Sequence, residues 1–371
     1  MKKVLFLSNG HGEDQTAAKI IEKLPPDIDI SIMPMVGDFA TVGARLITPL
    51  RLHVIGPKKS LPSGGFSARN LFALPKDILN GLFGLLYSQI KTLKSLRGQF
   101  DLVVAIGDVI PILAALVTRT PFIFVGVNKS DYYKTFGYNY TSWEKWLLKK
   151  YAKIVFARDE HTAKSLKEEG IKAVYEGNPL MDGIGAYEII EKKEGETIIG
   201  FLPGTRKEDI PKNIEDFEKI AEELLKIDKN FRFLIADNCE GTRLIAALRG
   251  APFETVIYNS DIIIGLSGTG NEQAAGIGKP VVSFVGRGAQ YNKKFANAQK
   301  ELLGDALSLI VGTNCNTPLQ IANEIITILH DPARYNYMSE TGKNRMGKSG
   351  ATKKIAEDIA DKVYEISKIM L

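Results

Sequence analysis

The chain has 371 residues, of which 44% are hydrophobic and 25% are charged. That composition is typical of globular proteins and excludes a disordered or fibrous chain, and the length suits two domains. The net charge of +5 comes from basic residues spread along the whole chain, so it favours a small anionic ligand and argues against a nucleic-acid-binding protein.

The first half of the chain alternates short apolar runs with helical patterns such as Thr16–Lys23. Buried strands separated by helices indicate a parallel sheet that is covered on both faces. The predicted strands are Val4–Ser8, Ile28–Met33, Leu102–Ile106, Phe122–Val127, Ile154–Ala157 and Ala173–Tyr175.

A charged segment with one glycine, residues 188–196, interrupts this pattern and is interpreted as an inter-domain linker. The pattern then restarts, with helices such as Asn213–Lys226 and a terminal helix over 352–369. We therefore predict an α/β protein with domains at 1–187 and 197–371, the terminal helix packing back on the first domain. The predicted strands of the second half are Ile198–Leu202, Phe231–Ala236, Thr255–Tyr258, Ile262–Leu266, Val281–Val285 and Leu307–Val311.

The cysteine content and the apolar runs indicate the compartment. The only cysteines are Cys239 and Cys315, which have no metal-ligand spacing and suit a reducing environment. The N-terminal segment is interpreted as a first strand rather than a signal peptide. The longest apolar run, Ile78–Tyr87, is shorter than the ~20 residues of a spanning helix. We expect a cytoplasmic protein without a bound metal.

Three glycine-containing loops follow predicted strands of the second half: Gly204-Thr205-Arg206, Ser267-Gly268-Thr269 and Gly286–Gln290. Small residues let a backbone approach an anion, a helix amino end favours negative charge, and a guanidinium suits a diphosphate. Such turns also occur as plain turn chemistry in doubly wound folds. Three of them on neighbouring strand ends favour a phosphate site.

These loops carry a resemblance to a known family. The segments LPGTRKEDI and SDIIIGLSGTGNEQAAGIGKPVVSF resemble the donor-binding motifs of the lipid-A-disaccharide synthase family and, more loosely, those of other GT-B glycosyltransferases and of nucleotide-sugar 2-epimerases. The resemblance implies the GT-B fold, in which two Rossmann-like doubly wound domains face each other across a cleft. It also implies a metal-independent hexosyltransferase that needs no cofactor and moves a sugar from a UDP-sugar donor to a lipid-linked or glycan acceptor.

The resemblance also implies roles for single residues. Arg206 would contact the diphosphate, and Gln273 would contact the ribose or the sugar. The family usually has a carboxylate where Gln273 stands, and here Glu272 comes one place earlier. The complete predicted donor site is Gly12, Gly204, Thr205, Arg206, Ser267, Gly268, Thr269, Glu272, Gln273, Gly288 and Gln290.

The loop after the first strand contains Gly10 and Gly12 but lacks the third glycine of a dinucleotide fingerprint, which argues against a dehydrogenase. In a GT-B fold this loop would lie beside the donor sugar. His11, Glu13 and Asp108 are the candidate catalytic residues, one of which would take a proton from the acceptor. Asp108 could equally cap the helix that follows it, and His11 could pack against its own turn.

Two further patterns each allow two interpretations. Apolar residues from Ile78 to residue 93 recur at helical spacing among lysines and arginines, which suits either a helix on an anionic membrane or a helix docked on its own sheet. Residues 342–349 match a P-loop pattern, but a helical pattern rather than a strand precedes them, which argues against ATP binding.

Transfer from a UDP-sugar is the preferred function at this stage. One alternative is a non-hydrolysing UDP-sugar 2-epimerase, which would form product without an acceptor. The other is a catalytically silent nucleotide-sugar-binding protein, which the glutamine at position 273 and the altered first loop both suit.

Overall fold

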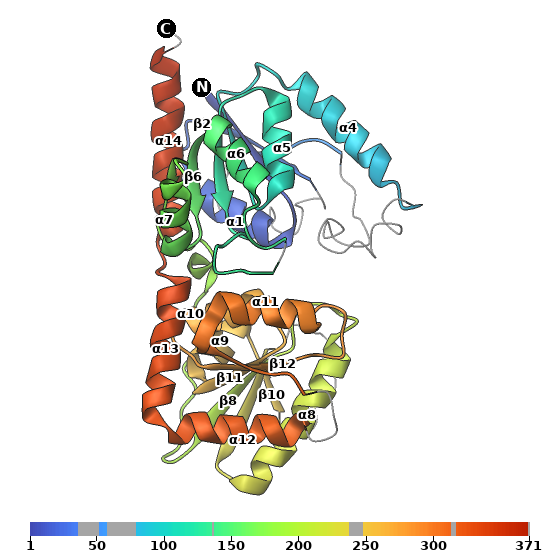
Figure 1. The fold of residues 1–371 in the computed structure, drawn as a ribbon, viewed down its shortest axis with the longest axis vertical. Coiled ribbons are helices and arrows are strands. Elements are labelled where there is room, and N and C mark those ends of the chain that lie inside the picture. Colours follow the sequence, from blue (N-terminus) through green and yellow to red (C-terminus); the bar gives the residue numbers. More distant parts are fainter. Residues whose placement is uncertain (36–51, 58–78, 136, 237–247, 313–316, 370–371) are drawn as a thin grey trace. The chain divides into compact units, whose positions relative to one another are not determined.

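A computed structural model describes the chain except for residues 36–51, 58–78, 136, 237–247, 313–316 and 370–371. Both cysteines, Cys239 and Cys315, lie outside the described residues. The chain divides into two compact units (Figure 1). The first contains Met1–Tyr132, Phe136–Gly183 and Ser349–Leu371, and the second contains Tyr133–Thr135 and Ile184–Lys348.

The first unit is built on a seven-stranded parallel sheet with the order β3-β2-β1-β4-β5-β6-β7. Its strands are runs of Val, Ile, Leu and Phe because both faces are covered by helices, and every residue of β4 is buried. The strands are β1 (Lys2–Ser8), β2 (Ile28–Pro34), β3 (Leu52–Val54), β4 (Leu102–Ile106), β5 (Phe122–Gly126), β6 (Ala152–Ala157) and β7 (Ala173–Val174).

Helices cover both faces of this sheet. One core cluster joins the sheet to α1 and α14, and a second joins its other face to α4, α5, α6 and α7. The helices are α1 (His11–Ile21), α4 (Leu82–Ser95), α5 (Val109–Thr118), α6 (Ser142–Tyr151), α7 (Glu160–Glu168) and α14 (Ala351–Ile369), with a 3-10 turn at Met181–Gly183. The carboxylate of Asp182 in that turn accepts hydrogen bonds from the backbone N–H groups of Gly350 and Thr352, which fixes the start of α14.

The second unit is built on a six-stranded parallel sheet with the order β10-β9-β8-β11-β12-β13. The strands are β8 (Thr197–Leu202), β9 (Phe231–Ala236), β10 (Leu248–Ala251), β11 (Ile262–Gly265), β12 (Val281–Phe284) and β13 (Leu307–Ile310). The helices are α8 (Ile210–Ile227), α9 (Phe253–Asn259), α10 (Thr269–Gly276), α11 (Lys293–Leu303), α12 (Thr317–His330) and α13 (Pro332–Met346), with a 3-10 turn at Gly304–Ala306.

The strands of the two sheets follow the same order of connection. In each, the chain adds strands outward from the centre in one direction and then crosses back to add strands on the other side. The crossing lies between β1 and β4 in the first sheet and between β8 and β11 in the second. Open parallel sheets bind ligands at this switch point, outside the carboxyl ends of the strands.

The structure corrects one predicted strand and adds two edge strands. Thr255–Tyr258 was predicted as a strand and lies in helix α9. A short apolar run does not distinguish the two structures, whereas Pro252 followed by Glu254 is a helix-start signal. The edge strands β3 and β10 were missed because half-exposed edge strands lack a continuous apolar run. None of the helices among the described residues is long and apolar enough to cross a bilayer.

The segment with the P-loop pattern begins inside helix α13, as its sequence context indicated. Gly342 of that helix lies directly against α10. A Cβ atom added at Gly342 would lie 2.3 Å from the carbonyl oxygen of Ala275. The two helices can therefore approach each other only because residue 342 has no side chain.

We expect Gly342→Ala to lower the free energy of unfolding by about 1–3 kcal/mol, because α10 and α13 must separate to admit the methyl group. Urea denaturation of the purified variant measures this. The matched control is Gly84→Ala in α4, where an added Cβ has no atom within 4 Å. The control should be neutral or slightly stabilising, since alanine favours helix. Equal stability of the Gly342 variant and the wild type would contradict the packing described.

Candidate functional site

The loops that follow β1 and β4 bring three carboxylates to the switch point of the first sheet. Glu13 and Asp14 lie in the first turn of α1, where a helix amino end favours negative charge. Asp108 follows β4. A Cβ atom added at Gly107, whose φ is +119°, would lie 2.7 Å from Cγ of Glu13. The two loops are therefore in close contact, and glycine is needed at position 107.

Each of these carboxylates is held by a hydrogen bond. Asn128, after β5, donates from Nδ2 to Oε1 of Glu13, which is itself buried. Ser8 donates from Oγ to Oδ1 of Asp14 at 2.5 Å. Sequence reasoning named Glu13 but missed Asp14 and Asn128. The acidic residue next to Glu13 was the available signal for Asp14, and no local pattern marks Asn128.

Asp108 caps the helix that follows it. Its Oδ1 accepts hydrogen bonds from the backbone N–H of Ile110 at 3.0 Å and from Nδ2 of Asn9 at 3.1 Å. The capping interpretation of this residue is therefore correct, whatever else the side chain does. His11 and Gly12 begin α1, and Gly12 is exposed with no atom within 4 Å of an added Cβ.

A buried ion pair fixes the loop that carries Asn128. Nζ of Lys129 lies 2.9 Å from Oε1 of Glu144 in α6 and donates to the carbonyl oxygen of Asn139 at 3.1 Å. The same glutamate accepts from the backbone N–H of Thr141 at 2.8 Å. Because a buried charge is costly without its partner, this pair holds the backbone next to Asn128 in one position.

The loops after β8 and β11 meet at the switch point of the second sheet. Gly204, with φ +82°, lies so close to the β11 loop that an added Cβ would be 3.0 Å from the carbonyl oxygen of Leu266. The structure thus brings together two of the loops that the sequence marked as phosphate-binding. Thr205 and Arg206 are exposed. The guanidinium of Arg206 has no hydrogen-bonding or ionic partner in the part of the chain that the structure describes.

The start of α10 is shaped by small residues. Gly268 is the N-cap and offers no side-chain cap to the helix. Oγ of Ser267 accepts a hydrogen bond from the backbone N–H of Gly270 at 3.2 Å, and Thr269, the first residue of the helix, is exposed. A helix start of this kind presents backbone N–H groups and a positive dipole end, which together favour an anion.

The third predicted phosphate loop is occupied by the protein itself. The carboxylate of Asp209 accepts hydrogen bonds from the backbone N–H groups of Ala289 and Gln290 at 3.1 and 3.0 Å. An added Cβ at Gly288 would lie 2.3 Å from Cγ of Asp209, so this glycine makes room for the carboxylate. The loop is thus tied to the start of α8, and the backbone N–H of Gln290 is already bound to the protein. The donor-binding role of Gly288 and Gln290 stays a prediction.

Other polar residues of these loops serve the packing of the second unit. Arg287 forms ion pairs with Glu215 and Asp216 at 2.8 and 2.9 Å. The pKa of Glu215 is lowered to about 2, first by a hydrogen bond from Lys219 and then by Arg287. Glu272 is buried and accepts a hydrogen bond from Nε2 of Gln299 at 3.0 Å. It thereby joins α10 to α11.

Gln273 is also buried, so the side chains of Glu272 and Gln273 are both largely shielded from solvent in this structure. Asn271, on the same helix, donates to the carbonyl oxygen of Gly265 at 3.2 Å and to the hydroxyl of Tyr291 at 3.1 Å. Burial raises the pKa of that tyrosine well above its usual value. The buried side of α10 is thus fixed to the end of β11.

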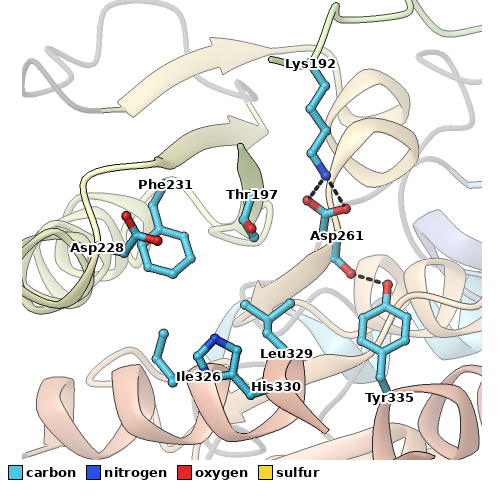
Figure 2. A pocket seen from close by; sticks show the side chains of 9 residues that line it. All are labelled: Lys192, Thr197, Asp228, Phe231, Asp261, Ile326, Leu329, His330 and Tyr335. Carbon is cyan, nitrogen blue, oxygen red and sulfur yellow. Dashed lines mark hydrogen bonds and ion pairs between the residues drawn. The ribbon is translucent and has the colours of Figure 1, made fainter. Parts of the chain in front are cut away.

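A pocket of about 250 Å³ lies beside the amino ends of the strands of the second sheet, opposite to their carboxyl ends (Figure 2). Nζ of Lys192 binds both carboxylate oxygens of Asp261 at 2.8 and 2.7 Å, and the hydroxyl of Tyr335 donates to the carbonyl oxygen of Asp261. The Lys192 ammonium and the Asp261 carboxylate are therefore paired with each other. The pocket lies at the amino end of β8, whereas the Arg206 loop follows the carboxyl end of that strand. It is lined by Lys192, Thr197, Asp228, Phe231, Asp261, Ile326, Leu329, His330 and Tyr335.

No group of His, Cys, Asp and Glu side chains among the described residues is arranged to hold a metal ion. The carboxylates Glu13, Asp14 and Asp108 are instead bound to hydrogen-bond donors of the first unit. Such groups can take and return protons, and the second unit offers a helix start and a guanidinium for an anion.

No family model and no curated protein sequence matches this chain. Solved structures do. MnaA from S. aureus, in a co-structure with UDP, is 18% identical over 97% of this chain and 96% of that chain, with a TM-score of 0.63. The calicheamicin glycosyltransferase CalG4 is 13% identical over 98% of both chains, with a TM-score of 0.62. The chain has the GT-B fold.

Another GT-B structure similar to this chain is UDP-GlcNAc 2-epimerase from Neisseria meningitidis, bound to UDP-GlcNAc. It is 17% identical over 97% of this chain and 100% of that chain, with a TM-score of 0.58. These structural similarities match the architecture of two Rossmann-like parallel-sheet units seen in this chain. The switch points of those units are the places where the GT-B fold of this chain gathers its polar loops.

Proposed function

We propose that this protein is an enzyme that binds a UDP-sugar through its second unit, and that its reaction is 2-epimerisation of the sugar without an acceptor. The observation that carries the proposal is the meeting of the Gly204–Arg206 and Ser267–Thr269 loops at the switch point between β8 and β11. A diphosphate placed there would meet helix N–H groups and the Arg206 guanidinium, which has no protein partner among the described residues.

The energetics of such a site suffice for nucleotide binding. Each charge-assisted hydrogen bond to phosphate contributes ~1.5–3 kcal/mol. A few of them reach the roughly 8 kcal/mol that micromolar affinity requires. Arg206 would supply one or two, and the start of α10 would supply others through Gly268 and Thr269.

Two lines of support favour epimerisation over transfer. The similar structures include several UDP-GlcNAc 2-epimerases, from Neisseria meningitidis and Methanocaldococcus jannaschii among others. Inversion at C2 removes the C2 proton while the C1–O bond to UDP breaks, so that the electrons of the C2–H bond form a C1=C2 double bond. A proton then returns to the other face of C2 as UDP re-forms its bond to C1. This chemistry needs groups that take and return a proton, and the first unit gathers Glu13, Asp14 and Asp108 at its switch point.

Glycosyl transfer is the second candidate, and the resemblance of residues 202–210 and 260–284 to the lipid-A-disaccharide synthase family supports it. In that case the first unit would hold a lipid-linked or glycan acceptor, and a carboxylate such as Glu13 would take the proton of the acceptor hydroxyl. The diphosphate site would be the same for both reactions.

Incubation with UDP-GlcNAc alone in D₂O, followed by proton NMR, separates the two reactions. Epimerisation predicts signals of the C2 epimer and replacement of the C2 proton by deuterium in both sugars, with no acceptor present. UDP release that begins only when a lipid or glycan acceptor is added would establish transfer instead. UDP-sugar binding with neither outcome would leave a nucleotide-sugar-binding protein and would contradict the proposed enzyme.

A further inference from the structure

Helix α4 of the first unit carries large apolar side chains on two faces. One face is buried and contains Leu85, Gln89 and Leu93, with Nε2 of Gln89 donating to the carbonyl oxygen of Met35 at 2.6 Å. This face packs against the unit as an amphipathic helix docked on its own sheet should. Docking therefore accounts for one face of the helix and leaves the other unexplained.

The second face is exposed to solvent. Leu79, three residues before α4, is 87% exposed, and on the helix Phe83 and Tyr87 are 66% and 72% exposed. Leu86 and Ile90 are exposed beside them. Positions 83, 86, 87 and 90 follow the i, i+3, i+4, i+7 spacing of one helical face. Isolated exposed apolar residues are ordinary, but a contiguous group of this size marks an interaction site.

The same face becomes basic toward the end of the helix. Lys91 lies one turn beyond Tyr87, and Lys94 lies one turn beyond Ile90; both are exposed and have no carboxylate partner among the described residues. The chain contains no acidic residue between Leu79 and Phe100. The face thus combines apolar side chains with uncompensated positive charge. Ile78, Lys58, Lys59, Arg69 and Lys76, which the sequence placed with this stripe, lie outside the described residues.

We propose that this surface, formed by Leu79, Phe83, Leu86, Tyr87, Ile90, Lys91 and Lys94, docks the protein on an anionic lipid bilayer. The apolar side chains enter the boundary between headgroups and acyl chains, and the lysines contact anionic headgroups. The helix lies in the plane of the interface, because it is too short to span a membrane. This role is independent of whether the enzyme epimerises or transfers a sugar.

Vesicle flotation tests the proposal with the full chain. At low salt, the wild type should float with vesicles of phosphatidylcholine mixed with phosphatidylglycerol, and it should stay at the bottom with phosphatidylcholine alone. High salt should weaken binding, since it screens the lysines. The double variant Phe83→Ser with Tyr87→Ser, and the double variant Lys91→Glu with Lys94→Glu, should each lose about tenfold or more in partitioning.

Matched controls distinguish binding through this surface from nonspecific adsorption of the protein to vesicles. Leu319→Ser with Tyr337→Ser removes two exposed apolar residues of the second unit, and Lys23→Glu with Lys229→Glu reverses two exposed lysines elsewhere. Both controls should bind vesicles as the wild type does, and melting curves should show that all variants are folded. A wild type that does not float, or controls that lose binding equally, would overturn the proposal. So would α4 variants that keep vesicle binding but change from dimer to monomer by light scattering, which would assign the surface to a second copy.

Discussion

Replacing Glu13 with Gln should lower the turnover of UDP-GlcNAc by about 10²–10⁴ while leaving UDP affinity unchanged. Gln has nearly the shape of Glu and can still accept the hydrogen bond that Asn128 donates, so the loop should keep its structure. What the variant loses is a group that can take a proton. Turnover is followed by NMR of the sugar, and affinity by calorimetry with UDP.

Variants at Asp108 supply the comparison, because that carboxylate also caps α5. Asp108→Asn keeps an acceptor for the N–H of Ile110, whereas Asp108→Ala loses it and should cost about 1 kcal/mol of stability. If Asp108→Asn loses turnover as Glu13→Gln does, both carboxylates act on the substrate. A fully active Glu13→Gln variant would remove Glu13 from the mechanism.

Replacing Arg206 with Ala should weaken UDP binding by about 10- to 100-fold, because a guanidinium bound to a diphosphate contributes ~1.5–3 kcal/mol. The side chain is exposed and has no protein partner among the described residues, so the fold should not change. Calorimetric titration with UDP measures the affinity, and thermal melting checks the fold.

The control for this variant is Arg287→Ala. Arg287 also follows a strand of the second sheet, but it is bound to Glu215 and Asp216 of α8. We expect the Arg287 variant to bind UDP as the wild type does. Equal loss of UDP affinity in both variants would show that general positive charge, rather than the Arg206 loop, sets the affinity. Unchanged UDP affinity in Arg206→Ala would show that the diphosphate does not bind at this loop.

The central strands could be predicted from the sequence because they are buried on both faces. Leu102–Ile106 and Phe231–Ala236 were predicted with the observed bounds. Edge strands are different: β10 has the sequence LRGA, in which Arg249 is exposed, so it carries no apolar run. Helix α9 was mistaken for a strand because its four central residues are apolar or β-branched.

The positions of the loops along the chain could be predicted from the positions of the strands, but the contacts between loops could not. Glycines after β8 and β11 could be recognised locally. The occupation of the Gly288 loop by Asp209 joins residues about 80 positions apart, and the bond between Asn128 and Glu13 spans 115 positions. Such pairs depend on which strands become neighbours. A single sequence contains no signal for them.

A crystal structure of the protein with bound UDP tests the central claim most directly. We expect a diphosphate at the backbone N–H groups where α10 starts, with the guanidinium of Arg206 in contact and the Asp209 carboxylate still bound to the loop that contains Gly288. A nucleotide bound elsewhere, for example in the pocket beside Phe231 and His330, would contradict it.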